Sequence, residues 1–524
     1  MIRLRDIPLP PEHSVTQLAF EAARMLKIQN SKIRDIKLVR RSVDARKKND
    51  IKIIYTIDVK VDGNEQKILR QSGCRRGTIA PVSFYKPPKK MEADCRPVVV
   101  GFGPAGMFAA LLLAMAGLKP LVLERGEDAQ TRHEKVEKFF STGKLDPKSN
   151  VQFGEGGAGT FSDGKLNTGV NNPRIGWILE QMVKAGAREE ILFDAKPHVG
   201  TDVLLTVVQN IRQRIISLGG EIRFNSHVVD IQKSGEQITG LVLEGGEIVP
   251  CTHAVLAIGH SARDTFSMLY EKDIAMEAKP FAMGVRIEHP QSLINTAQYG
   301  KDDPVLPPAD YKLVKHLDNE TVYTFCMCPG GFVVAATSEE GSVVTNGMSY
   351  ADRDGENANA ALLVSINPKD FPENDVLAGV RWQEAIEKKA FRVGGGNYFA
   401  PAQRVEDFLA GRPSTGPGTV NPTYRPGVTW CDLHEVLPEK LTRALKEALP
   451  QLDGNLRGFC HPDSVLTAPE TRSSSPVRII RDETKQSVSL KGLYPAGEGA
   501  GYAGGIMSAA IDGMMCAEAI IESL

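Results

Sequence analysis

Three glycines and one acid carry the clearest chemical signal in this sequence. Gly101, Gly103 and Gly106 follow the β-branched run at 97–100 in the spacing G-x-G-x-x-G. The first glycine permits a tight turn, the second lets the backbone approach a pyrophosphate, and the third lets a helix pack closely on a strand. Glu124 ends the next apolar run, where a carboxylate can bond both hydroxyls of a ribose and would repel a 2′-phosphate. An ordinary glycine turn is the alternative interpretation, but Glu124 at the end of the next apolar run favours a dinucleotide-binding site.

A second glycine cluster, FGEGGAGTFSDGK, occupies residues 153–165. It lies where an extended flavin dinucleotide would continue from its pyrophosphate toward the ring. The alternative is a flexible surface loop.

A third cluster, LYPAGEGAGYAGGIMSAAID, occupies residues 493–512. Glu498 ends an apolar run, where it can bond a ribityl hydroxyl, and a helix is expected to begin near Gly505 and Ile506. The N–H groups of that helix would face the flavin pyrimidine edge, which becomes anionic on reduction. A purely structural C-terminal helix is the alternative, and it leaves the crowded glycines unexplained.

These residues need a parallel sheet to position them. The sequence predicts a strand at 97–101, a helix at 106–118 and a strand at 120–124, which together form a βαβ unit. A further helix is expected at 202–218, and further strands at 221–224, 228–232, 238–243 and 254–258. A strand, glycine loop and helix return after residue 489. We therefore predict an α/β, Rossmann-like FAD-binding domain in two parts, 96–262 and 466–524, with an inserted α+β, β-rich substrate domain at 263–465.

A small basic α+β module is expected at residues 1–90. It contains a short strand at 1–5, a helix after Ser14 and β-runs at 33–43 and 51–61, and it ends in the Lys/Pro-rich piece YKPPKK. Its net charge is +12, against −13 for the remainder of the chain. Such asymmetry marks a separate module with a potential acidic partner.

Composition narrows the class of protein. The chain has 524 residues, of which 42% are apolar and 24% charged, which is typical of a globular multidomain protein. Eight cysteines without a CxxC argue against a disulfide framework, and the N-terminal residues show no secretory signal, so we expect a cytoplasmic protein. Residues 97–118 are uncharged and long enough to span a bilayer, but glycines and a proline interrupt them, so no membrane segment is expected.

The three clusters together resemble the FAD-binding domain of glutathione-reductase-like flavoproteins. The whole chain resembles the family called FAD-dependent, or NAD(FAD)-utilising, dehydrogenases, through strings such as VQFGEGGAGTFSDGKL, LAIGHSARDT, FCMCPGG and ETRSSSPVRI. The resemblance implies non-covalent FAD and gives no substrate. The expected FAD contacts, from the motifs and the resemblance, are Gly101, Gly103, Pro104, Ala105, Gly106, Glu124, Arg125, Gly156, Gly157, Gly159, Thr160, Phe161, Ser162, Lys165, Val228, Val229, Ala257, Gly259, Gly497, Glu498, Gly504, Gly505 and Ile506.

Candidates for catalysis are fewer. Lys165 and His260 lie in strings expected near the flavin, whereas Arg286 and Arg472 could recognise an anionic group or form structural ion pairs. Cys326-x-Cys328 is interpreted as a pair of buried small side chains. The histidines lack metal-ligand spacing, so no metal site is predicted.

Two functions remain open from the sequence. The first is an FAD-dependent oxidoreductase that moves hydride between a small carbon substrate and flavin N5, with NAD(P)H as a candidate transient donor. The sequence shows no second strand–G-x-G-x-x-G–helix unit that would form a dedicated NAD(P)H domain of the disulfide-reductase type. The second is a flavoprotein whose basic module binds nucleic acid or another acidic partner. Tyr55 is the lone aromatic in the central strands of that module, which disfavours a stacking platform for RNA.

Overall fold

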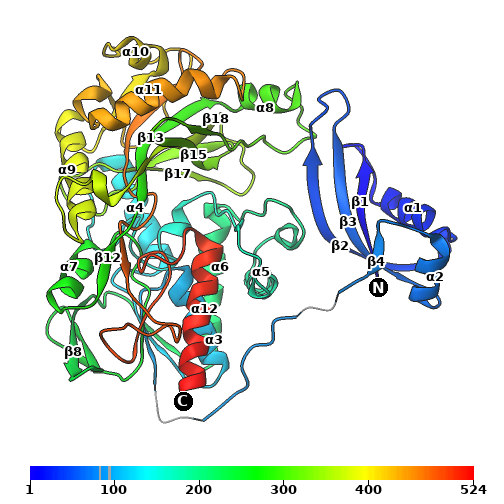
Figure 1. The fold of residues 1–524 in the computed structure, drawn as a ribbon, viewed down its shortest axis with the longest axis horizontal. Coiled ribbons are helices and arrows are strands. Elements are labelled where there is room, and N and C mark those ends of the chain that lie inside the picture. Colours follow the sequence, from blue (N-terminus) through cyan, green and yellow to red (C-terminus); the bar gives the residue numbers. More distant parts are fainter. Residues whose placement is uncertain (82–83, 93–95) are drawn as a thin grey trace.

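The computed structural model (Figure 1) describes residues 1–81, 84–92 and 96–524 and contains a five-stranded parallel sheet. The strand order is β23-β11-β5-β6-β7. The strands are β5 (Val98–Val100), β6 (Leu121–Leu123), β7 (Glu221–Arg223), β11 (Ala254–Leu256) and β23 (Leu493–Pro495). Four of the five are fully buried apolar triplets, as expected of parallel strands covered on both faces. The last strand of the chain, β23, therefore lies in the same sheet as β5, the strand that precedes the turn at Gly101.

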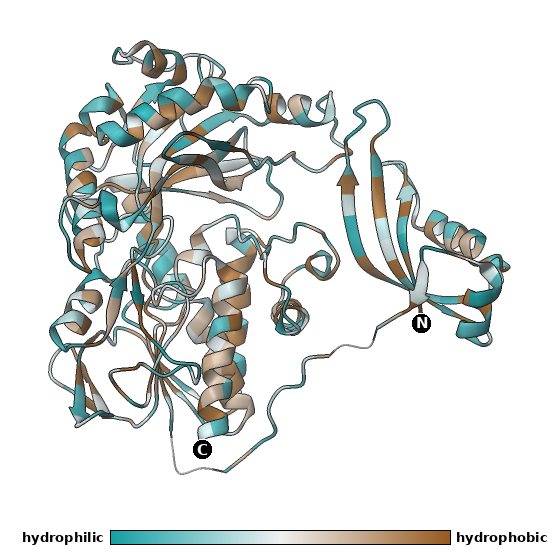
Figure 2. Cartoon of the chain, viewed as in Figure 1, coloured by the Kyte–Doolittle hydropathy of each residue, from teal (hydrophilic) through white to brown (hydrophobic). Residues whose placement is uncertain are grey.

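Helices α3 (Pro104–Met115) and α12 (Ile506–Ser523) pack side by side against this sheet, with α6 (Thr201–Ser217) on the other side of α3. Both α3 and α12 are largely hydrophobic (Figure 2). Ten consecutive residues of α3, from Ala105 to Ala114, are buried, which explains why the helix is apolar on every side. The remaining elements of this half are α4 (Ala129–Thr142), α5 (Arg174–Lys184), α7 (Arg263–Glu271) and the antiparallel sheet of β8 (Val228–Ser234), β9 (Gln237–Leu243) and β10 (Ile248–Pro250).

A seven-stranded sheet of order β14-β15-β18-β13-β21-β19-β20 is formed by chain that runs between β11 and β23. Its strands are β13 (Phe281–Pro290), β14 (Val314–His316), β15 (Thr321–Cys328), β18 (Asn357–Ile366), β19 (Ala400–Arg404), β20 (Val428–Trp430) and β21 (Val465–Glu470). Two small pairs accompany it, β16 (Gly331–Ala335) with β17 (Thr345–Ser349), and β12 (Met276–Ala278) with β22 (Val477–Ile479). Helices α8 (Gln291–Tyr299), α9 (Ala378–Val393), α10 (Val405–Ala410) and α11 (Glu439–Asp453) cover its outer side (Figure 1).

The N-terminal residues form a four-stranded sheet set to one side of the molecule (Figure 1). Its elements are β1 (Ile2–Leu9), α1 (Val15–Leu26), β2 (Ile33–Asp44), β3 (Lys52–Val61), α2 (Glu65–Ser72) and β4 (Gly77–Ile79). Strand β2 contacts the rest of the chain, because Arg41 donates hydrogen bonds to both Asp194 carboxylate oxygens and exchanges backbone hydrogen bonds with residues 193 and 195. The chain that follows this sheet is also anchored: the Tyr85 hydroxyl donates to Glu518 on α12.

The predicted α/β arrangement around a parallel sheet is confirmed, with element ends shifted by one to three residues. The uncharged stretch at 97–118 divides into β5, a turn and α3. No helix among the described residues is long and apolar enough to cross a membrane. The sequence interpretation missed α2, α4 and α5, and β1 is longer than the expected strand at 1–5.

Candidate functional site

A cavity of about 330 Å³ opens at the carboxyl ends of the parallel strands. Val100, Leu123 and Ala257 line its floor, and residues of the seven-stranded sheet and its neighbouring strands, among them Cys326 and Glu470, line the opposite wall. The carboxyl edge of a parallel sheet is where ligands bind in open α/β folds. The cavity volume lies at the lower end of the range for small-molecule and cofactor sites.

The turn after β5 forms one end of the cavity. Gly101 has φ +92°, and a Cβ at this position would lie 2.3 Å from the Ala257 carbonyl oxygen. A Cβ on Gly106 would lie 1.9 Å from the Gly101 carbonyl oxygen, so this glycine lets α3 pack against the turn rather than lining the cavity. The Ala105 and Gly106 N–H groups stand in the first turn of α3 and have no intrahelical acceptor. Of the two residues, Ala105 lines the cavity, where a helix N-terminus suits an anion such as a pyrophosphate.

Glu124 lines the cavity but is already engaged by the protein. One carboxylate oxygen accepts from the Phe102 N–H at 2.7 Å, and the other accepts from the N–H groups of Gly126 and Gly154 at 2.9 and 3.0 Å. The side chain therefore ties the end of β6 to two glycine loops. Carboxylate oxygens accept more than one hydrogen bond, so capacity for ribose hydroxyls is left.

Arg125 and Val228 lie at the same end of the cavity. The Arg125 guanidinium lies 4.3 Å from the Phe153 ring centroid and hydrogen-bonds His227 and Asp264. Although burial opposes it, His227 and Arg125 hold the pKa of Asp264 well below its usual range. Val229 does not line the cavity and is 39% exposed. Its expected cofactor contact is therefore wrong, because neighbouring side chains of β8 point to opposite faces.

The first turn of α12 forms the other end. Gly504, Gly505 and Ile506 line the cavity there, and a Cβ on either glycine would meet nothing within 4 Å. Glu498 lines the wall beside them and accepts from the Gly505 N–H. Burial raises the pKa of Glu498 to about 7. A helix N-terminus and a titratable carboxyl thus face the same open space.

Part of the 153–165 cluster lies behind the wall. Gly157, Gly159, Ser162 and Lys165 line the cavity, as do Gly103, Pro104, Ala105, Ala257 and Gly259. The other expected contacts, Gly106, Gly156, Thr160, Phe161 and Gly497, do not. Phe161 is 1% exposed and packs under the Arg132 guanidinium, 4.8 Å from its ring centroid. These residues support the loop instead of touching a ligand.

Of the four catalytic candidates, Lys165, His260 and Arg472 line the cavity, and Arg286 does not. Burial, followed by the charges of Arg472 and Arg263, lowers the pKa of His260 to about 4, so the ring is neutral near pH 7. Arg286 is fully buried and pairs with Glu470 at 3.3 Å. For Arg286, the structural ion pair is the interpretation that the structure supports.

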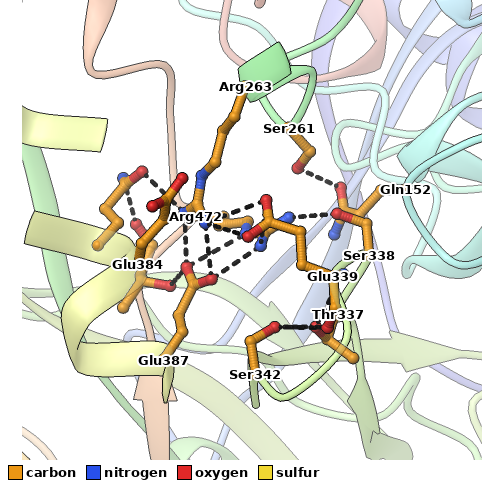
Figure 3. Close-up of polar contacts among 12 residues, drawn as sticks. Gln152, Ser261, Arg263, Thr337, Ser338, Glu339, Ser342, Glu384, Glu387 and Arg472 are labelled. Atoms are coloured by element: carbon orange, nitrogen blue, oxygen red, sulfur yellow. Dashed lines mark hydrogen bonds and ion pairs between the residues drawn. The ribbon is translucent and has the colours of Figure 1, made fainter. Parts of the chain in front are cut away.

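The Arg472 guanidinium is likewise occupied (Figure 3). It bonds Glu387 on α9 at 2.8 Å and the Ser338 hydroxyl at 2.6 Å, and Arg263 at the start of α7 holds the same carboxylate at 2.7 Å. Burial alone would raise the pKa of Glu387, but the two guanidinium groups lower it to about 2. Arg472 is thus held in an internal ion pair, and its expected role in recognising an anion is not supported.

Several cavity residues escaped the sequence interpretation. They include Phe102, Gln152, Phe153, His227, Ser261, Phe325, Cys326, Asn346, Glu470 and Ser473. Seven of them lie in strings that carry the family resemblance, namely Gln152, Phe153, Ser261, Phe325, Cys326, Glu470 and Ser473. The cysteines of one such string, FCMCPGG, were interpreted as buried. Cys328 is indeed buried, whereas Cys326 is partly exposed and lines the cavity, so that interpretation was wrong for Cys326.

Comparison with known proteins gives a family. Residues 280–473 match the model described as "FAD-dependent protein, C-terminal domain-like", and residues 1–60 match a domain of unknown function. An uncharacterized protein of Clostridium beijerinckii (strain ATCC 51743 / NCIMB 8052) is 47% identical over 527 residues, which cover 99% of this chain and 98% of the relative. The chain belongs to the family of this clostridial protein. The likeness to an FAD-dependent domain covers residues 280–473, and the narrower NAD(FAD)-utilising dehydrogenase family stays a prediction.

Solved structures offer only distant likenesses to this family member. Glycine oxidase from Bacillus cereus ATCC 14579 is 13% identical with a TM-score of 0.33, covering 82% of this chain and 98% of its own. L-proline dehydrogenase from P.horikoshii is 11% identical with a TM-score of 0.34, covering 83% and 94%. At such values no activity is transferred to this chain.

The residues present fit FAD. The cavity has a helix N-terminus at each end, one for the pyrophosphate and one for the edge of the flavin ring. The glycines at both ends leave room for a ligand against the backbone. Both carboxylates expected to bond sugar or ribityl hydroxyls, Glu124 and Glu498, line the space between.

Proposed function

We propose that this protein is an FAD-dependent oxidoreductase that transfers hydride between a small carbon substrate and N5 of a non-covalently bound flavin. The observation that carries the proposal is the single cavity shared by the glycine turn of α3, the first turn of α12 and the wall formed by the seven-stranded sheet region. Bound FAD would supply the two-electron chemistry. The protein binds and orients it and brings a substrate to one face.

The chain's own residues have separable roles in this proposal. Ala105 would hold the pyrophosphate through its backbone N–H group, and Glu124 would hold the ribose. The start of α12 and Lys165 would stabilise negative charge on the reduced ring, since both lie on the cavity wall. Glu470 is the group best placed to take or give a proton, because burial raises its pKa to about 7 while it still faces the cavity.

Cofactor content tests the first part of the proposal. The purified protein should be yellow, and acid precipitation should release FAD into the supernatant. Flavin that stays with the pellet would contradict the non-covalent attachment. FMN, or no flavin, would contradict the site.

Anaerobic mixing with NADH or NADPH tests the electron donor. Loss of the oxidised-flavin absorbance after mixing with either nucleotide would support NAD(P)H as the transient donor. A flavin that dithionite reduces and neither nucleotide reduces would contradict that role and leave the carbon substrate as the donor.

A further inference from the structure

Cys326 and Cys328 end strand β15 at the cavity wall. Among the cysteines that the structure describes, Cys326 alone lines the cavity. It lines the same cavity as Glu470, Glu498 and the first residues of α12, where the flavin ring is proposed to lie.

The backbone at this point is not regular strand. The register of β15 against β18 shifts between Phe325 and Cys328, and Cys326 has φ +40°, a left-handed conformation for a residue that is not glycine. Such conformations persist where surrounding structure enforces them, and they cluster at functional sites. In a regular strand two residues advance about 6.6 Å, close to the upper limit of Cα separation in a disulfide. The Cys328 sulfur approaches the Cys326 carbonyl oxygen, so the two residues are in direct contact at this irregular point of the strand.

Contacts around the pair favour a thiolate. The Cys328 thiol lies 3.3 Å from the Cys326 carbonyl oxygen, and Arg286 donates to the same oxygen at 2.9 Å and contacts the Cys328 sulfur at 3.6 Å. Lys165 donates to the carbonyl oxygen of Met327 between them. A hydrogen bond from Cys328, with the charges of Lys165 and Arg286, lowers the pKa of Cys326. The hydrogen bond with Cys326, followed by burial, raises the pKa of Cys328, so Cys326 is the member of the pair that more readily becomes a thiolate.

We propose that Cys326 and Cys328 form a redox-active pair that exchanges two electrons with the flavin; this inference rests on the proposed function. In the forward step the Cys326 thiolate and the Cys328 thiol lose two electrons and one proton as a Sγ–Sγ bond forms. The oxidised flavin takes up both electrons and the proton. The reverse step breaks the Sγ–Sγ bond and restores the thiolate and the thiol.

An electron count on the holoprotein tests the pair. The protein is oxidised with diamide, desalted and titrated anaerobically with dithionite while the flavin absorbance is followed. The wild type should take up about four electrons per FAD, two for the flavin and two for the disulfide. Cys326→Ser and Cys328→Ser should each take up about two. Cys431→Ser, a partly buried cysteine outside the cavity, should behave as the wild type.

Mass spectrometry supplies a reading that does not depend on flavin. After diamide, the peptide that carries both cysteines should be lighter by two hydrogens and should regain them on reduction. A wild type that takes up two electrons, or a peptide that never forms the internal bond, would overturn the pair. A protein that forms the bond but binds no FAD would contradict the proposed function instead, so the two failures are distinguishable.

Discussion

Glu124 illustrates how one side chain serves the cofactor and the protein together. Its carboxylate accepts three backbone N–H groups while it lines the cavity. In Glu124→Gln the amide nitrogen cannot accept, so at least one of those N–H groups loses its partner, as does a ribose hydroxyl. We expect FAD binding to weaken by about 1–3 kcal/mol, or about 5- to 150-fold in Kd, measured by titrating the apoprotein with FAD. Glu221→Gln, which changes a surface carboxylate on β7, is the matched control. Equal Kd values for the two variants would show that Glu124 does not bind the ribose.

The raised pKa of Glu498 predicts how the stability of the protein depends on pH. Because burial raises its pKa in the folded protein to about 7, against an ordinary value of 4.5, the folded state binds this proton more tightly than the unfolded chain. The resulting stabilisation is complete below about pH 4.5 and is lost as the pH rises through about 7. The Tm of the wild-type apoprotein should therefore fall relative to that of Glu498→Gln between pH 5 and pH 8. Other groups titrate equally in both proteins and cancel, so parallel Tm curves would show that Glu498 titrates normally.

At the scale of elements, α7, α9 and the chain after β21 are joined through one carboxylate (Figure 3). Glu387 on α9 is fully buried and pairs with Arg263 and Arg472. Glu387→Gln would remove the buried carboxylate charge and leave the partly exposed Glu339 as the remaining counter-charge of both guanidinium groups. Breaking a buried pair in this way costs about 3–5 kcal/mol, so a large fall in Tm is expected.

Glu384 supplies the control for this prediction. It lies one turn earlier on α9, where it is paired with the exposed Lys388 at 3.8 Å. Glu384→Gln should lower the Tm little, since exposed pairs are worth at most about 1 kcal/mol. Similar losses for both variants would mean that Glu387 does not hold these elements together.

The parts that could be predicted from the sequence are local. The glycines of the turn at 101–106 stand close together in the sequence, and a Cβ on Gly106 would meet the Gly101 carbonyl oxygen within that same turn. The place of Cys326 depends instead on the pairing of β15 with β18 and on a shift in that pairing. Arg472 meets Glu387 across 85 residues of sequence, so neither spacing nor composition could distinguish its ion pair from an anion site. The positions of side chains that depend on long-range pairing therefore could not be predicted from the sequence.

For the whole molecule, the basic module and the flavin site are expected to be separable. None of the residues at 1–81 lines the cavity, whereas Tyr85 bonds Glu518 on α12 and packs edge-on against Trp177. A protein lacking residues 1–80 should therefore keep FAD. A protein lacking residues 1–91 should keep it with a lower Tm, because α12, which begins at the flavin end, loses an anchor. Loss of flavin from the shorter deletion would show that the module buttresses the site.

The same deletion tests whether the module binds nucleic acid. Its positive charge gave reason to expect an acidic partner, but several of the cations concerned already have partners within the chain. Arg41 pairs with Asp194, Arg46 pairs with Asp44, and Lys48 donates to the Ala297 carbonyl oxygen. We expect the intact protein to bind RNA or DNA weakly and without sequence preference, with an affinity that falls steeply as salt releases the counterions. Binding is measured by fluorescence anisotropy at low and moderate salt for the intact protein and for the protein lacking residues 1–80. A sequence-specific affinity that persists at moderate salt and disappears with the deletion would contradict this expectation and favour the nucleic-acid function.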